Sequence, residues 1–118
     1  NKEVLPVLPP EEKWSLNQQI RRSSQSIPAN IAEGHGRFYF QDNVRFCYIA
    51  RGSLEETLSH IVYAYKVDYI SETTYKSFTA DGENLSRLIN RYIAFLKKSK
   101  QGANEPGASY SVGEDLAE

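Results

Sequence analysis

The sequence contains little cysteine and no long apolar run, and both shortages narrow the setting in which the protein works. Cys47 is the single cysteine, so no disulfide can form within the chain, and we expect a buried thiol in a reducing compartment. No stretch approaches the roughly 20 apolar residues that span a bilayer, and residues 1–10 lack the basic start and apolar centre of a signal peptide. The sequence therefore predicts a cytoplasmic protein that does not enter a membrane.

Patterns typical of catalysis and metal binding are also missing. His35 and His60 have no partner at metal-ligand spacing, and Ser23, Ser24 and Ser26 have no base at a recognisable position. Helical bundles that catalyse reactions usually display inward carboxylate and histidine ligands, and the sequence has no Glu-x-x-His pair. We therefore expect a protein that is not an enzyme and that takes no metal, cofactor or small-molecule substrate.

The chain has the length and composition of one globular domain. Its 118 residues are 40% hydrophobic and 25% charged, which is ordinary for a protein that buries its own core. Residues 1–100 hold all 14 Lys and Arg residues against 11 acids, whereas residues 101–118 hold four acids, no base and many turn-forming residues. The sequence predicts a modestly basic helical-bundle domain over residues 1–100 and a mobile acidic tail over residues 101–118.

Three segments place apolar residues three and four positions apart, a spacing typical of amphipathic helices, and none suggests a strand. They cover residues 10 to about 34, 40–67 and 72–98. The first contains Pro28 and is expected to end at a left-handed glycine, Gly34 or Gly36, whereas Ser71 is expected to cap the third. One apolar face of the third segment should be buried, and it consists of Tyr75, Phe78, Leu85, Leu88, Tyr92, Phe95 and Leu96.

Polar residues of the first segment are spaced as regularly as its apolar ones. On a helix they share the face opposite Ile20, Ile27 and Ile31. This polar ridge consists of Gln18, Arg22, Ser26, Asn30 and Glu33. Short Ser and Asn side chains leave the backbone approachable, and Arg offers a forked donor. Two roles stay open for the ridge: hydrogen bonding to neighbouring helices or subunits, and contact with a ligand.

The second segment carries a glycine in its middle. Glycine destabilises a helix interior, so its presence indicates close approach of another backbone or a bulky side chain. Gly52 and Glu56 share the face directed away from Leu54. A contact between subunits is the preferred explanation, and packing within the chain is the alternative. In either case Glu56 can pair with Arg21 or Arg22.

Several motifs of these segments match one family. They are QIRR at 19–22, SIPANIAEG at 26–34, GR at 36–37, Ala50, GSL at 52–54, Glu56 and YIS at 69–71. Over about Pro9 to Lys98 the chain resembles the four-helix bundle proteins first noted as open reading frames in intervening sequences of 23S ribosomal RNA genes. Asp68 stands where that family usually has glycine, and aspartate tolerates the left-handed conformation that the turn needs.

The resemblance implies an all-α, up-and-down antiparallel four-helix bundle that assembles into a ring-like homopentamer without enzymatic activity. The family has a long helix before the position of Pro9, so the first of the four helices is expected to be largely missing from this chain. Related accessory proteins of diversity-generating retroelements are similar in architecture, and they bind nucleic acid and reverse transcriptase.

The leading hypothesis for function is an oligomeric module that binds RNA or DNA phosphates through its basic residues. The residues concerned are Arg21, Arg22, Arg37, Arg45 and Arg51. Because the excess of base over acid is small, the affinity should be weak and steeply dependent on salt. The alternative is a protein-interaction scaffold without nucleic-acid contact, in which the polar ridge and the face of Gly52, Ser53 and Glu56 bind a protein partner.

Overall fold

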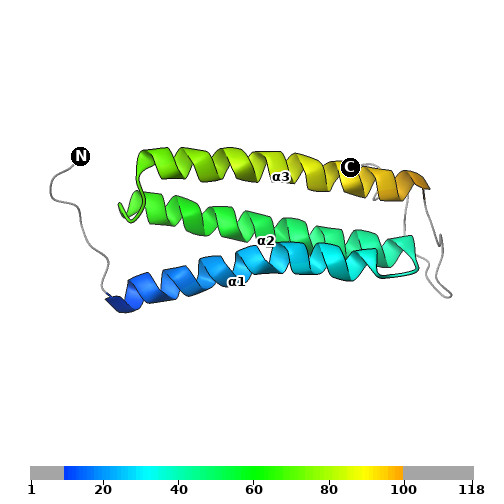
Figure 1. Cartoon of the computed structure of the whole chain (residues 1–118), viewed down its shortest axis with the longest axis horizontal. Helices are drawn as coiled ribbons and strands as arrows, with labels where there is room; N and C mark the ends of the chain where they lie inside the picture. The colour runs from blue at the N-terminus through cyan, green and yellow to red at the C-terminus, as the bar shows by residue number, and fades with distance from the viewer. Residues whose placement is uncertain (1–9, 100–118) are drawn as a thin grey trace.

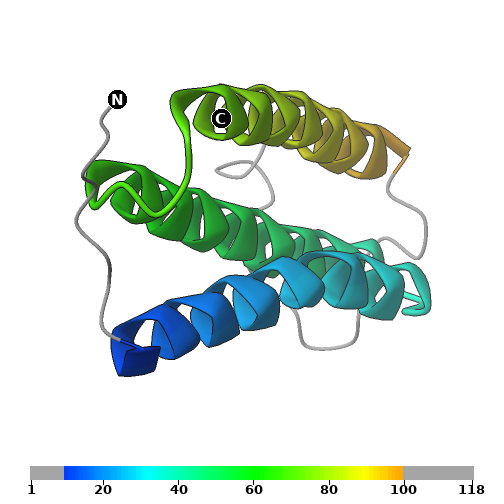
Figure 2. The same ribbon diagram turned by 60° about the vertical axis from the view of Figure 1, so that its left-hand side comes forward.

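The protein is all-α, as the sequence predicts. The computed structural model describes residues 10–99, and in this range it contains three long helices and no strand. They are α1 (Pro10–His35), α2 (Phe40–Lys66) and α3 (Glu72–Ser99). Successive helices run antiparallel, with α2 between α1 and α3 (Figure 1). The turned view in Figure 2 shows α1 and α3 apart from each other on either side of α2. The predicted acidic tail lies outside the described residues.

Helix α1 begins where its sequence favours a helix. Pro10 occupies the first turn, where a missing N–H is harmless, and Glu11 and Glu12 lie at the positive end of the helix dipole. The helix continues through Pro28 and ends at His35.

The way in which α1 ends differs from the prediction. Neither Gly34 nor Gly36 adopts a left-handed φ, so the predicted glycine cap is wrong. Gly34 is instead buried against α2, where a Cβ atom would lie 2.8 Å from both Asn43 Oδ1 and Phe46 Cβ. Glycine is required here because α2 approaches the end of α1 too closely for any side chain.

The turn between α2 and α3 follows its local chemistry. Asp68 has a φ of 63°, the left-handed conformation that the sequence predicts for it. The Tyr69 N–H then donates to the Ala64 carbonyl at 2.8 Å, a bond typical of a helix that ends in a left-handed residue. Ser71 caps α3 as predicted, because its Oγ accepts the Thr74 N–H at 3.1 Å.

All three helices contribute to the main hydrophobic core. Its buried residues are Ile27, Phe40, Val44, Cys47, Ala50, Leu54, Ile89, Ile93 and Leu96. A smaller cluster around Leu16 and Ala64 closes the end of the molecule near the start of α1. The core therefore runs along α2, which both other helices pack against.

Helix α3 buries only part of the predicted face, namely Leu96 and, half-buried against the core, Leu85 and Tyr92. Ile89 and Ile93 are buried, whereas Phe78, Leu88 and Phe95 are 45%, 55% and 62% exposed. The predicted apolar face of α3 is therefore wrong at these three positions. Helical spacing identifies the apolar side of a helix but not the neighbours that cover it, and α3 packs mainly on α2.

Candidate binding surfaces

The middle of the polar ridge lies against α2. Ser26 Oγ and Ser53 Oγ are 2.8 Å apart, and Asn30 Nδ2 donates to both the carbonyl and the hydroxyl of Ser26 at 2.8 Å. One turn earlier, Thr57 Oγ1 donates to Oγ of the fully buried Ser23 at 2.8 Å. We call these four hydroxyl residues of α1 and α2 the hydroxyl ladder. Because these side chains are small and satisfy one another, the two helices pack closely without leaving the four hydroxyl groups unpaired.

The ladder corrects the expected orientation of α1. Ser26 and Asn30 are half-buried at the α1–α2 interface, although the sequence placed them opposite the apolar stripe. Ile20 and Ile31 turn toward the space between α1 and α3 instead. Helix α1 thus meets α2 through its hydroxyl side, which no hydrophobic pattern could indicate.

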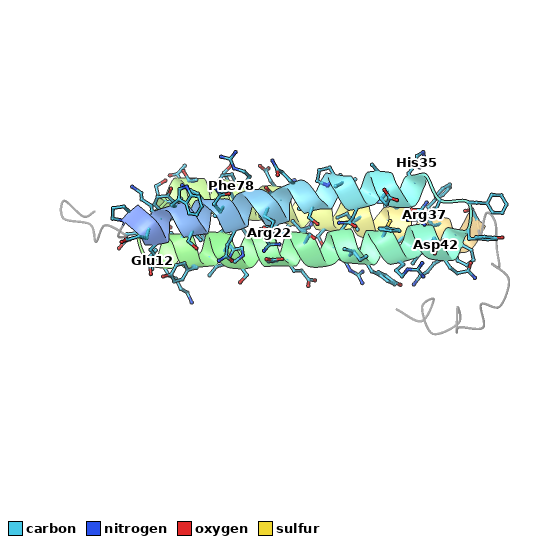
Figure 3. The ribbon with its side chains drawn as sticks, turned by 90° about the horizontal axis from the view of Figure 1, so that it is seen from below. Glu12, Arg22, His35, Arg37, Asp42 and Phe78 are labelled. Carbon is cyan, nitrogen blue, oxygen red and sulfur yellow. The ribbon has the colours of Figure 1, made fainter. Side chains whose placement is uncertain are left out.

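Arg22 and Glu56 also join α1 to α2. Arg22 Nη2 lies 2.5 Å from Glu56 Oε2, and His60 Nε2 lies 3.5 Å from the same carboxylate oxygen. Figure 3 shows Arg22 at the boundary between the two helices. The hydrogen bond from Arg22, helped by the charges of Arg22 and His60 and opposed by desolvation, lowers the pKa of Glu56 below its ordinary value. Of the two predicted partners for Glu56, the structure selects Arg22.

Two further predicted phosphate-binding arginines contact carboxylates of their own chain. Arg37 Nη2 lies 3.0 Å from Glu33 Oε2, and its guanidinium stacks 4.9 Å from the Phe46 ring centroid. Arg45 pairs with Asp42 one turn away on α2. Arg37 and Asp42 lie toward the same end of the bundle in Figure 3. These arginines and carboxylates neutralise each other, which leaves less positive potential for an anionic ligand.

One other ridge residue, Gln18, and two arginines, Arg21 and Arg51, behave differently. Gln18 and Arg21 are exposed, and neither makes a side-chain hydrogen bond or ion pair within residues 10–99. Arg51 reaches across to α3, where its Nη1 donates to Asn90 Oδ1 at 2.8 Å, and its guanidinium lies 4.9 Å from the Tyr48 ring centroid. The ten predicted site residues therefore form no single site, and four of them, Arg22, Ser26, Ser53 and Glu56, join α1 to α2 through hydrogen bonds.

Gly52 lies on the open outer surface of α2. A Cβ atom added there would have no atom of the described residues within 4 Å, apart from its own helical neighbourhood. Exposed apolar side chains flank it on the same face, with Ile49 46% and Tyr63 43% exposed. Packing among residues 10–99 therefore does not explain Gly52.

The described residues form an apolar groove between α1 and α3, which the sequence analysis did not predict. One part of it, about 860 Å³, is lined by Ser24, Ile27, Pro28, Ile31, Ala32, His35, Leu85, Leu88, Ile89 and Tyr92. A neighbouring part of about 710 Å³ continues it past Ile20, Leu58, Ile70 and Phe78. The one feature of the sequence that points to this groove is the apolar side of α3, which is too wide for a single neighbouring helix to cover.

The polar groups at one end of the groove contact one another. His35 Nδ1 and Asn43 Nδ2 each lie 3.3 Å from the Tyr92 hydroxyl. Cys47 Sγ, fully buried next to them, contacts Asn43 Oδ1 at 3.8 Å, and burial raises the pKa of the Cys47 thiol to about 11. A thiol with so high a pKa is a poor nucleophile at neutral pH.

Within residues 10–99 no three or more His, Cys, Asp or Glu residues cluster closely enough to hold a metal ion. None of the helices in this range combines the length and the hydropathy that a membrane span requires.

The fold and the contacts define a class of protein: a small antiparallel helical bundle in which polar side chains link neighbouring helices. The sequence matches the family described as 23S rRNA-intervening sequence protein over residues 2–91, and the chain belongs to this family. A crystal structure from Bacteroides thetaiotaomicron, described as a protein with unknown function from the S23 ribosomal protein family, is similar. It is 28% identical with a TM-score of 0.64, and the match covers 66% of this chain and 72% of that one. No curated protein matches the sequence.

Proposed function

We propose that the protein is a non-enzymatic component of a cytoplasmic assembly, built from copies of itself, that binds RNA or DNA weakly. The open groove between α1 and α3 is the observation that carries this proposal. Its walls expose large apolar side chains such as Leu88 and Phe78, and contiguous apolar surface of this kind is typical of a face that another element covers.

The groove has the shape that a fourth helix would fill. In an up-and-down bundle each helix packs against two neighbours, whereas α1 and α3 each pack extensively on α2 alone. A fourth amphipathic helix between α1 and α3 would cover Ile31, Leu85 and Leu88 and complete the antiparallel four-helix bundle. Either another part of the protein or a partner can supply this helix.

Gly52 supports assembly with further copies. Its outer face on α2 lies away from the groove, and it combines a bare backbone with the exposed side chains of Ile49 and Tyr63. A second helix can approach closely at a glycine, and tyrosine is a residue that interfaces favour. We propose that this face forms the contacts of a ring-like homo-oligomer, with five copies as the expected number.

The nucleic-acid part of the proposal rests on charge and on the family. Residues 1–100 carry three more bases than acids, and the description of the family refers to an intervening sequence of 23S rRNA. Because Arg22, Arg37 and Arg45 are paired with carboxylates, the net attraction for phosphate is small. We therefore expect binding that weakens steeply between low and moderate salt.

A protein partner without nucleic acid is the second candidate, and the exposed apolar residues around Gly52 favour it. Pull-down before and after nuclease treatment separates the two possibilities. A protein partner persists after nuclease treatment, whereas a partner bridged by RNA is lost.

Light scattering on a size-exclusion column, with absorbance read at 260 and 280 nm, tests the main proposal. A mass of about 67 kDa, five times the 13.4 kDa chain, would support the ring. Excess absorbance at 260 nm in that peak would support nucleic acid as the partner. A monomer without nucleic acid, at every concentration tested, would overturn the proposed assembly.

A further inference from the structure

Helix α3 presents a second surface next to the apolar groove. Asn84, Arg87, Arg91, Phe95 and Lys98 follow one another at intervals of three, four, four and three residues, so they lie along one side of the helix. All five are exposed. We call this set the cationic stripe. It lies outside the two sets of residues that line the groove.

Within residues 10–99 the cations of the stripe have no acidic partner, in contrast to Arg22, Arg37 and Arg45. From Asn84 to Ser99 the sequence contains four bases and no acid. Arg87 donates a hydrogen bond to the neutral amide oxygen of Asn84, and within residues 10–99 none of Arg87, Arg91 and Lys98 forms an ion pair. Their charges and donor groups are therefore available to an anion, whereas the carboxylates beside Arg22, Arg37 and Arg45 compete with one.

The neighbouring edge of α2 adds to the positive potential. Arg51 contacts Asn90, which follows Arg87 by less than one turn of α3. Lys97 Nζ lies 5.4 Å from the Tyr48 ring centroid. Positive charge thus extends from the stripe across the boundary between α2 and α3.

An exposed aromatic ring lies within the same stripe. Phe95 is 62% exposed, one turn beyond Arg91 and one turn before Lys98. Tyr92 supports the ring from the groove side, with the two ring centroids 6.4 Å apart and the planes nearly parallel. Cations interleaved with an accessible aromatic ring are the combination that binds single-stranded nucleic acid, because phosphates take the charges and bases stack on the ring.

We propose that the cationic stripe binds single-stranded nucleic acid, with phosphates on Arg87, Arg91 and Lys98 and a base stacked on Phe95. This inference rests on the proposed function and locates it on α3 rather than on the arginines of α1. An anionic membrane fits the stripe less well, because a helix that lies in a membrane surface inserts its apolar face, and Ile89 and Ile93 on that face of α3 are buried against α2.

Fluorescence anisotropy with a labelled oligouridine, on the full chain, tests this assignment. The variant Arg87→Gln, Arg91→Gln, Lys98→Gln should bind at least tenfold more weakly at low salt and should lower the slope of log K against log[salt] by about 2, since about 0.7 is lost per phosphate contact. Phe95→Ala should bind about tenfold more weakly while keeping the slope. The matched control Lys13→Gln, Lys66→Gln, Lys76→Gln removes the same charge at the opposite end of the bundle and should bind like the wild type.

The outcomes separate the inference from the function on which it rests. Equal losses in the two triple variants would overturn the stripe and leave only a general charge effect. If the α3 variant binds oligouridine as tightly as the wild type does, the assignment to the stripe is also overturned, while the proposed function stands. No wild-type binding even at low salt would overturn both. Binding to anionic phosphatidylserine vesicles is measured as well. If the protein binds these vesicles more tightly than oligouridine, and the α3 variant loses this binding, the stripe is assigned to a membrane instead. Circular dichroism confirms that each variant is folded.

Discussion

Arg22 and Glu56 resemble binding residues in the sequence, yet in the folded chain they hold two helices together. Both groups stay partly exposed, so their attraction is screened and adds little to the free energy of folding. Its clearest consequence is the lowered pKa of Glu56. A carboxylate with a lowered pKa in the folded state stabilises the fold above its ordinary pKa, and this contribution is lost as the pH falls through the lowered value.

Arg22→Gln is therefore expected to raise the pKa of Glu56 toward its ordinary range. The cause is the loss of the hydrogen bond and the charge that Arg22 supplies. A carbon-13 NMR titration of the Glu56 side-chain carboxyl measures the change directly. Arg21→Gln is the control, because Arg21 lies next in the chain and makes no ion pair within residues 10–99; a similar shift in the control would contradict the assignment.

Substitution by alanine should change the free energy of unfolding in opposite directions at Gly34 and at Gly52. Gly34→Ala places a Cβ atom against Asn43 and Phe46, so it should lower the free energy of unfolding by about 1–3 kcal/mol. Gly52→Ala meets no other side chain or helix of residues 10–99 within 4 Å, and it should raise the free energy of unfolding by up to about 1 kcal/mol in the dissociated chain, because alanine favours helix. Thermal unfolding of dilute protein measures both. A Gly52→Ala chain that melts below the wild type under these conditions would show that the site is not open.

At the scale of elements, the sequence predicts the helices well because local chemistry sets their ends. Pro10, Asp68 and Ser71 act within a few residues of their own position, so their effects can be read without knowledge of the tertiary structure. The glycine cap failed for a tertiary reason. Gly34 allows α2 to pack closely against the end of α1, and a sequence does not show which helix packs at a given glycine.

The candidate site was harder to predict, since its residues are defined by neighbours. The spacing of Ser26 and Asn30 shows that they share a helix face, but not that Ser53 lies opposite them. Paired arginines and unpaired arginines likewise look the same in a sequence. Arg22 and Arg91 are distinguished only by the carboxylate that lies beside one of them.

Adjacent residues of α3 provide a test of the groove. Ile89→Ala should lower the free energy of unfolding by about 2–5 kcal/mol, because Ile89 is 3% exposed in the core. Leu88→Ala should cost less than about 1 kcal/mol, because Leu88 is 55% exposed at the edge of the groove. Denaturation with urea measures the two values. Similar losses of stability in the two variants would show that another helix covers Leu88.

The whole molecule separates its charges along the sequence. The net charge is −1, but residues 101–118 contribute −4, so residues 1–100 carry +3. Acidic residues compete with phosphate for the same cations. Residues 1–100 should therefore strengthen the binding of a polyanion, and residues 101–118 should weaken it.

Removing residues 101–118 should therefore tighten the binding of oligouridine several-fold at low salt, and this gain should shrink as salt screens the charges. Anisotropy titrations at two salt concentrations measure the effect. A chain of full length with Glu105, Glu114 and Glu118 changed to Gln and Asp115 changed to Asn has the same net charge as the shortened chain. If charge is the cause, both should bind equally; a gain confined to the shortened chain would contradict it.

The hydroxyl ladder has a consequence for motion. Helix α1 is bound to α2 by this ladder and by the Arg22–Glu56 pair, and it contacts α2 more extensively than α3 does. Regions with fewer contacts open at lower free energy than the molecule as a whole, in cooperative units that often match supersecondary motifs. We expect the amide hydrogens of α3 to exchange with solvent before those at the centres of α1 and α2. The α1–α2 hairpin would then be the unit that persists when the protein partly unfolds.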